Sequence, residues 1–170
     1  MPVSDNMKAA LAYLDERGIR YSLRRHVAVF TSDEADRHRG GFTGISCKNL
    51  FLRNKKATRH FLVTIPTTER FDLDAFAASV GEKHLSFGSP ERLMDYLGVT
   101  PGSVSPMCLV NDPGHRVEFF IHPSILEAHE VSMHPNDNTA SLWLSQEEFR
   151  RFLDSTGHSR TPLSSHVPTA

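Results

Sequence analysis

The stretch CKNLFLRNKK, residues 47–56, places Lys48 and Asn49 at the start of an alternating apolar run that ends in basic residues. The segment from residue 20 to residue 60 holds ten Lys or Arg and three acidic residues, a net charge of +7, whereas the whole chain carries −1. Such a segment is either a solvated basic face or a surface for a polyanion. The acidic remainder argues against non-specific duplex binding and leaves open a contact with one end of a nucleic acid.

Side chains that hold metals or form covalent intermediates do not occur at the spacings such sites need. His122, His129 and His134 share one stretch, but no HExxH pair occurs, and Cys47 and Cys108 form no CxxC pair. Both cysteines fall in predicted strands, where a small buried apolar residue is the commoner role. The serines of GSVSP lack the GxSxG elbow, and no GxGxxG or GxxxxGK phosphate loop is present. We therefore expect neither a metal nor a cofactor.

Three separated stretches remain as candidates for chemistry. They are Lys48 with Asn49, the loop 102–106 that begins at Gly102 and ends at Pro106, and HPNDNTA at residues 134–140. Composition alone does not join them, so the elements that position them have to be considered.

Length and charge distribution bound the fold. A chain of 170 residues is about one domain with a sizeable core. Two cysteines fit a reducing compartment better than a disulfide framework. The first predicted helix carries charges throughout, unlike the apolar core of a signal peptide, and no window is apolar enough for a membrane span. The sequence predicts a soluble, cytoplasmic protein.

Capping signals and apolar periodicity place the helices and strands. Predicted helices span residues 4–17, 71–81, 89–98 and 145–157, with one more short helix between the TSDE capping box at Thr31 and the glycines at 40 and 41. Predicted strands span residues 21–26, 47–53, 59–65, 107–110, 117–121, 130–134 and 140–144. We expect a single α/β domain over residues 1–157, with a mixed, mostly antiparallel central sheet flanked by helices. The Pro- and Ser-rich stretch 158–170 is expected to be a loose tail.

These motifs together resemble a known family. CKNLFLRNKK, then LSFGSPERLMDYLGVTPGSVSP, LVND and HPNDNTA, are similar in kind and order to the free-standing bacterial Ala-tRNA(Pro) deacylases. That family belongs to the superfamily that includes the editing domain inserted in prolyl-tRNA synthetase and the YbaK-type Cys-tRNA(Pro) deacylases. The resemblance covers about residues 11–157.

The resemblance implies an enzyme that hydrolyses the ester between alanine and the 3′ end of proline tRNA. Alanine fits inside any pocket made for proline, and each missing methylene is worth only about 1–3 kcal/mol of discrimination, so a second, smaller site has to correct the error. Attack by water with help from the tRNA ribose hydroxyl is implied, without a metal or a covalent intermediate. Proline tRNA is the implied partner, and prolyl-tRNA synthetase is a candidate one.

The resemblance also implies roles for individual residues. Lys48 would hold the terminal phosphate or sugar with Asn49 supporting the site, because a compact ammonium suits that contact. The backbone of the GxxxP loop would bind the substrate carbonyl or α-amino region. The residues expected in the catalytic site are Lys48, Asn49, Gly102 and Ser105; those expected around the alanine pocket are Thr31, Pro106, His134, Asn138 and Thr139; those expected to bind tRNA are Arg53, Lys55, Lys56 and Arg59. Ser105 is expected as a contact and not as a nucleophile.

Each of these residues also has an ordinary structural interpretation, such as an exposed strand lysine, a turn, a helix cap or a core histidine. Asn136 and Asp137 stand where the family pattern has a mainly aliphatic residue and its neighbour, and His122 stands where an acidic residue is expected. Two alternatives therefore remain open: a non-catalytic module that binds tRNA or a synthetase, and a deacylase for another small aminoacyl group, Cys or Ser.

Overall fold

The computed structural model describes residues 4–26 and 42–163. Thr31 and the short helix predicted to begin there lie outside the described residues. In the described segments no helix is both long enough and apolar enough to cross a membrane.

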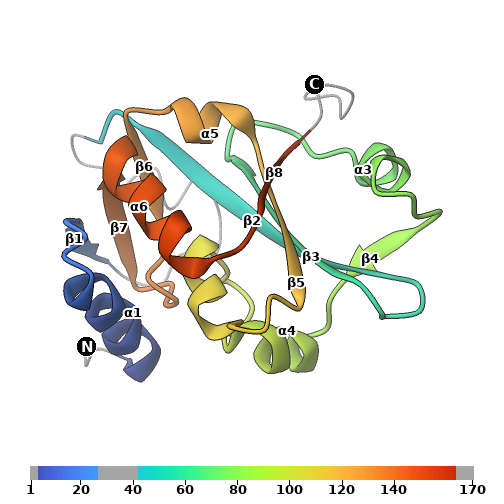
Figure 1. Ribbon diagram of the computed structural model, residues 1–170, viewed down its shortest axis with the longest axis horizontal. Helices are drawn as coiled ribbons and strands as arrows, with labels where there is room; N and C mark the ends of the chain where they lie inside the picture. Colours follow the sequence, from blue (N-terminus) through green and yellow to red (C-terminus); the bar gives the residue numbers. More distant parts are fainter. Residues whose placement is uncertain (1–3, 27–41, 164–170) are drawn as a thin grey trace.

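A mixed eight-stranded sheet forms the centre of the molecule, in the order β1-β7-β6-β2-β3-β5-β8 with β4 added to β2 (Figure 1). Its longest strand, β2, pairs antiparallel with β3 and β4 and parallel with β6. The parallel pairs β3–β5 and β5–β8 complete one half, and the antiparallel pairs β6–β7 and β1–β7 complete the other. The strands are β1 (Ser22–Arg25), β2 (Ile45–Asn54), β3 (His60–Pro66), β4 (Leu85–Phe87), β5 (Val117–Ile121), β6 (Glu130–Met133), β7 (Ala140–Ser145) and β8 (Arg160–Pro162). The predicted fold class is confirmed.

Helices cover both faces of this sheet. They are α1 (Asp5–Glu16), α3 (Leu73–Ser79), α4 (Pro90–Leu97), α5 (Pro123–Glu127) and α6 (Gln146–Thr156), with a 3-10 helix, η1 (Pro106–Asn111). The side chains of Ser4, Asp72, Ser89 and Ser145 accept hydrogen bonds from backbone N–H groups in the first turns of α1, α3, α4 and α6. Asp72, Ser89 and Ser145 are the N-caps that the sequence predicts. Each of the four side chains satisfies a donor that a helix start leaves unpaired.

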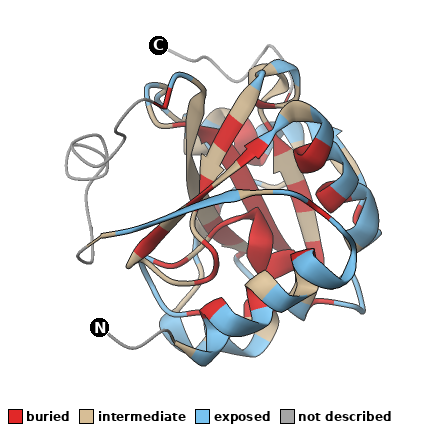
Figure 2. Cartoon of the chain, turned by 90° about the vertical axis from the view of Figure 1, so that its left-hand side faces the viewer, coloured by how far each residue is buried: buried red, intermediate tan, exposed pale blue. Residues whose placement is uncertain are grey.

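Alternation along β2 divides the core into two clusters. Phe51 packs with residues of α1, α4, η1 and α6, whereas Leu52 packs with residues of β3, β4 and α3. Because successive strand residues point to opposite faces, odd-numbered positions of β2 face the first cluster and even-numbered positions the second. Figure 2 shows buried residues along the strands and on the sides of the helices that face the sheet.

The β2–β3 hairpin is closed by Asn54. Its Oδ1 accepts hydrogen bonds from the backbone N–H groups of Thr58 (2.9 Å) and Arg59 (3.2 Å), and Ala57 takes a left-handed φ of 53°. Asparagine commonly stabilises a turn in this way. The predicted hairpin is confirmed, and its turn presents Lys55 and Lys56 to solvent.

Two predicted segments differ from the structure. Residues 107–110, predicted as a strand, lie in η1, because Pro106 fixes a helical φ at the first position and Ser105 Oγ caps Met107 N at 3.1 Å. Residues 158–163, predicted as the start of a loose tail, include β8, which pairs with β5, and end at the buried Leu163. Within this segment His158 is buried against Asp112, at 3.2 Å from Nε2 to Oδ2. The short strand β4 and the short helix α5 were not predicted.

Candidate active site

Asn49 connects β2 to the GxxxP loop. Its Nδ2 donates to the Val104 carbonyl at 3.0 Å, and its Oδ1 accepts from the Thr64 hydroxyl of β3 at 2.8 Å. Thr64 is fully buried, so the amide is fixed from both ends and its orientation follows from its partners. Asn49 therefore positions the backbone of the loop.

Ser105 connects that loop to the segment between β6 and β7. Its hydroxyl donates to the His134 carbonyl at 2.6 Å and accepts from Met107 N at 3.1 Å. The side chain is fully buried and its proton is committed to a carbonyl. This agrees with the expectation that Ser105 is not a nucleophile.

These contacts bring together residues from all three stretches that the sequence leaves separate. Asn49 of β2, Val104 and Ser105 of the loop, and His134 after β6 form one continuous series of hydrogen-bonded residues. Pro106 is buried at the start of η1, directly behind the loop.

His134 presents one ring nitrogen as an acceptor. Its Nδ1 lies 2.9 Å from the Ala140 carbonyl, and because a carbonyl only accepts, Nδ1 carries the proton and a neutral ring keeps a lone pair on Nε2. Burial lowers the pKa of His134 from its usual value. The ring also meets His26 edge-on, with 6.3 Å between centroids. The site thus holds a neutral, half-buried imidazole.

The β6–β7 connection is fixed by its own side chains. Asp137 Oδ1 accepts from Thr139 N (2.8 Å) and from the Thr139 hydroxyl (2.6 Å), so the Thr139 proton is used inside the loop. Asn138 is half-buried and makes no hydrogen bond to any described side chain or backbone group. Asn136 has a left-handed φ of 57° and is buried. Asn138 and Thr139 are the two residues of this connection that are predicted to line the pocket. The Thr139 hydroxyl is hydrogen-bonded within the loop, whereas the Asn138 side-chain amide has no hydrogen bond to the described residues.

Lys48 lies on the opposite face of β2 from Asn49. Its Nζ donates to the Glu69 carbonyl in the loop that follows β3. Neighbouring strand residues point to opposite faces, so the described contacts do not join Lys48 to the series that runs from Asn49 to His134. A recess of about 190 Å³ is lined by Glu69 and by residues that include Ser46, Thr67, Thr68 and Ser124. Lys48 therefore contacts Glu69, a residue of this recess, and lies on the other face of β2 from the series that includes Asn49.

The backbone of the GxxxP loop has donors to offer. Gly102 takes a left-handed φ of 88°, which favours glycine, and it is exposed. The Ser103 N–H donates to the Thr100 carbonyl at 3.1 Å, whereas those of Gly102, Val104 and Ser105 donate to no group in the described part of the chain. Such N–H groups can bind an oxygen on which negative charge develops.

The four predicted tRNA-binding residues differ in how far their donors are engaged. The Arg59 guanidinium makes a bidentate pair with Glu118, 2.8 Å for each bond, and also contacts Glu82 and the Val80 carbonyl. Arg53 donates to two carbonyls of its own turn. Lys55 and Lys56 are exposed and have no acidic partner among the described residues. Arg59 thus forms ion pairs within the fold. The positive charges of Arg53, Lys55 and Lys56 are not neutralised by an acidic side chain of the described residues, so they are available to a ligand.

Neither cysteine is suited to nucleophilic attack. Burial raises the pKa of the Cys108 thiol to about 12, and Cys108 Sγ lies 2.6 Å from the Ser105 carbonyl. Burial also raises the pKa of Cys47. A thiol is reactive as the thiolate, so both groups stay protonated near neutral pH. Over residues 4–26 and 42–163, no three His, Cys, Asp or Glu side chains are grouped as a metal would require.

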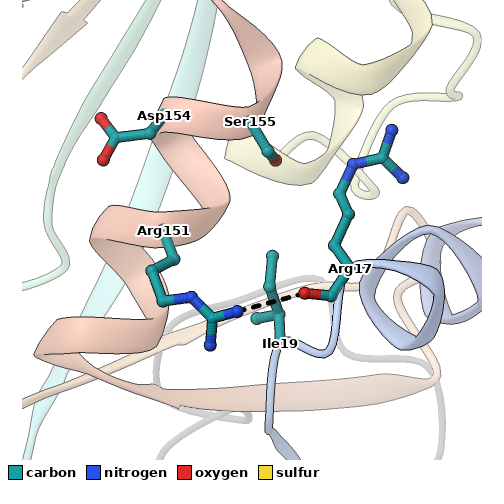
Figure 3. A pocket seen from close by; sticks show the side chains of 5 residues that line it. All are labelled: Arg17, Ile19, Arg151, Asp154 and Ser155. Carbon is teal, nitrogen blue, oxygen red and sulfur yellow. Dashed lines mark hydrogen bonds between the residues drawn. The ribbon is translucent and has the colours of Figure 1, made fainter.

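A second recess lies away from these residues, between α1 and α6 (Figure 3). It measures about 380 Å³ and is lined by Arg17, Ile19, Arg151, Asp154 and Ser155. Arg151 donates to the Arg17 carbonyl at 3.1 Å and pairs with Glu148, while the Arg17 guanidinium lies over the Tyr13 ring. The side chains of Arg17 and Arg151 are thus engaged in contacts within and between the two helices. No predicted site residue lines this recess.

Several groups of the site were not predicted, namely Thr64, Glu69 and the carbonyls of Val104, His134 and Ala140. The contributing atom is a backbone carbonyl in every case except Thr64, and residue type carries no signal for it. His122, where the family pattern suggested an acid, caps α5 through its Nδ1, which lies 2.7 Å from the Ser124 hydroxyl.

The sequence and the fold are similar to those of known tRNA-editing proteins. The profile of the aminoacyl-tRNA editing domain matches residues 26–152. The prolyl-tRNA editing protein ProX of Acetoanaerobium sticklandii is 35% identical over 154 residues, covering 91% of this chain and 94% of that protein. The prolyl-tRNA synthetase associated domain-containing protein 1 of Bos taurus is 35% identical over 157 residues, covering 89% and 91%. The solved structure of a candidate trans-editing enzyme for prolyl tRNA synthetase superposes with a TM-score of 0.72 at 21% identity, covering 96% and 99%.

Proposed function

Because this chain belongs to the aminoacyl-tRNA editing domain family, we propose that it is a free-standing deacylase that hydrolyses the ester between alanine and proline tRNA. The observation that carries the proposal is the hydrogen-bonded series Asn49, Val104, Ser105 and His134, which forms one site from three distant stretches. The relative from Acetoanaerobium sticklandii is named as a prolyl-tRNA editing protein and aligns over nearly its whole length.

The GxxxP loop stabilises the ester as it is attacked. Attack on an ester carbonyl places negative charge on its oxygen, and fixed N–H donors lower the energy of that state. The N–H groups of Val104 and Ser105 are suited to this because Asn49 and His134 hold the loop on both sides. Asn49 and Ser105 therefore act by positioning, and we expect water, helped by the tRNA ribose hydroxyl, to be the nucleophile.

His134 and Asn138 limit the size of the amino acid. The neutral imidazole and the half-buried amide border the same loop, and His134 Nε2 offers an acceptor to the substrate. A pocket that fits only a methyl side chain excludes the proline ring by steric clash. It can therefore discriminate alanine from proline, which a pocket large enough for proline cannot do.

Lys48 holds the tRNA end. Its ammonium donates to a neutral carbonyl, that of Glu69, and a phosphate is a stronger acceptor because the bond is then charge-assisted at both ends. Lys48 is the fourth residue of β2, so the tRNA backbone can meet it at the start of the strand while the ester contacts the loop on the other face. We expect the protein to act in the cytoplasm, beside the prolyl-tRNA synthetase that makes the mischarged product.

A deacylation panel tests the proposal. Purified protein is incubated with Ala-, Cys-, Ser- and Pro-tRNA(Pro), and loss of the ester is followed in time against a blank without protein. We expect rapid hydrolysis of Ala-tRNA(Pro) and none of Pro-tRNA(Pro). Faster hydrolysis of the Cys or Ser ester would assign another specificity to the same site. Binding without hydrolysis of any ester would replace the proposal by a non-catalytic tRNA-binding module.

A further inference from the structure

His26 lies beside the proposed amino-acid pocket, although no motif of the sequence singled it out. It directly follows β1 and is half-buried. Its backbone N–H donates to the Thr139 carbonyl at 2.9 Å, and its Nε2 lies 3.0 Å from the Ser141 hydroxyl. His26 is thus bonded to the residues on both sides of Ala140, the residue whose carbonyl accepts from His134 Nδ1.

The strand register places His26, Ser141 and His134 on one face of the sheet. The strands β1, β7 and β6 are neighbours at one edge (Figure 1). Continued by one residue, the antiparallel register of β1 on β7 sets His26 opposite Thr139, two residues from Ser141. Continued by one residue, the antiparallel register of β6 on β7 sets His134 opposite Ser141. Opposite residues, and residues two apart on a strand, point to the same face, so Ser141 lies between the two histidines.

The two imidazole rings also contact each other directly. Their centroids are 6.3 Å apart and their planes are inclined by 60°, an edge-to-face arrangement within the usual range for aromatic pairs. The bond from His134 Nδ1 to Ala140 and the contact with the His26 ring together restrict the orientation of the His134 ring. They also restrict the direction in which the His134 Nε2 acceptor points. The bond to Ser141 in turn restricts the His26 ring.

We propose that His26 is a positioning residue of the deacylase, which holds the His134 imidazole through its ring contact and through its bond to Ser141. The proposal rests on the proposed function, in that the His134 ring borders the pocket for the esterified alanine. His26 acts on that ring and not on the substrate. A displacement of about 1 Å can cost on the order of a hundredfold in rate, so a ring released by loss of His26 changes both the rate and the size of amino acid that fits.

The first test observes the His134 ring in the free protein and does not depend on hydrolysis. Protein labelled with ¹⁵N-histidine is studied by NMR at about pH 7.5, where a histidine of ordinary pKa is neutral and its two ring nitrogens are distinct. We expect the wild type to carry the His134 proton on Nδ1. In His26→Ala and in Ser141→Ala the two nitrogen resonances of His134 should move toward each other as the tautomers mix. Ser141→Ala removes only one hydroxyl, so it also serves if His26→Ala does not fold.

The second test measures rate and selectivity. We expect His26→Ala to hydrolyse Ala-tRNA(Pro) about ten- to hundredfold more slowly or to accept Pro-tRNA(Pro) as well. The double variant His26→Ala/Ser141→Ala should be no worse than His26→Ala alone, because both changes remove the same hydrogen bond. His129→Ala is the matched control, since it removes another bond between a histidine and a hydroxyl, that of Nε2 to Thr43 at 3.2 Å. It should leave the His134 resonances, the rate and the selectivity unchanged.

The two tests together separate a positioning role from a structural one. Wild-type resonances of His134 in the folded His26→Ala and Ser141→Ala variants overturn the proposal. So do displaced resonances accompanied by the wild-type rate and selectivity, because the ring orientation would then not matter to the reaction. If the wild type hydrolyses no ester, the proposed function fails, while the NMR comparison still decides whether His26 holds the His134 ring.

Discussion

Ser105 Oγ donates a hydrogen bond of 2.6 Å to the His134 carbonyl, across 29 residues of sequence. This contact joins the loop that offers N–H donors to the residue whose imidazole we propose to border the amino-acid pocket. A site that selects by size depends on the distance between the two, because a shift of about 1 Å can cost on the order of a hundredfold in rate.

Removing the Ser105 hydroxyl should show whether this residue positions the catalytic loop or only stabilises the fold. Ser105→Ala loses the bond to His134 and the cap on Met107 N, so we expect the free energy of unfolding to fall by about 1–2 kcal/mol. We expect the deacylation rate to fall about ten- to hundredfold, since the loop is no longer held. Ser79→Ala, which removes a bond of 2.7 Å to the Phe76 carbonyl in α3, is the control and should lower stability without lowering the rate. Equal activity in the two variants would assign Ser105 to the fold alone.

Lys48 is expected to act through its charge. Lys48→Ala should lose most turnover while circular dichroism and melting temperature stay near those of the wild type, because the ammonium contacts only one loop carbonyl in the described structure. Lys48→Arg should recover little, since a planar fork replaces a compact ammonium. Lys8→Met, which removes an exposed lysine of α1, provides the control. Near wild-type deacylation by Lys48→Ala would sink the assignment.

Much of the fold could be predicted because its signals are local. The caps at Ser4, Asp72, Ser89 and Ser145 use residues three positions apart, and the hairpin is set by Asn54 and the alternation around it. The run at 107–110 could not be assigned on periodicity, because four apolar residues fit a strand or a buried helical turn equally well. The three-residue strands β4 and β8 depend on distant partners and leave almost no pattern of their own.

The site was predictable in its residue types and not in its connections. Asn49, Ser105 and His134 were all expected, but the groups that join them are the carbonyls of Val104 and His134, for which sequence gives no signal. The opposite orientation of Lys48 and Asn49 follows from the period of two in a strand. Arg59 was expected to contact tRNA, and its pairing with Glu118 depends on the parallel register of β3 and β5, which only the structure gives.

Acid should destabilise the protein through two histidines. Burial lowers the pKa values of His60 and His134 in the folded state, so below about pH 6.5 the unfolded chain binds protons that the folded chain does not. The stability contributed by the neutral rings is complete above that pH and is lost as the pH falls toward the folded-state values. We expect the free energy of unfolding, measured in urea, to decrease between about pH 7.5 and about pH 5.5.

His60→Phe isolates one of the two groups. Its ring lies between Phe51 and Tyr96, and its Nε2 has no partner, so phenylalanine can take its place. We expect this variant to lose less stability than the wild type over the same pH range. An unchanged pH slope would show that His60 is not protonated on unfolding.

Arg59 and Lys55 should behave in opposite ways. Arg59→Met breaks the pairs with Glu118 and Glu82, and because the guanidinium is about one-third exposed we expect a loss of only about 1–2 kcal/mol. Its salt slope for RNA binding should match the wild type. Lys55→Met should leave stability within ~0.5 kcal/mol and reduce the slope by about one. A flatter slope for Arg59→Met would return that residue to the RNA surface.

Size selection is measured most directly by competition. Ala-tRNA(Pro) and Pro-tRNA(Pro) carrying different radiolabels are mixed in one tube, and the ratio of their deacylation rates is followed for the wild type and for His134→Ala. We predict that the wild type hydrolyses the alanine ester and spares the proline ester, and that His134→Ala either hydrolyses both or loses activity on alanine. A wild type that cleaves both esters equally, or a His134→Ala variant with unchanged rate and selectivity, would contradict the account.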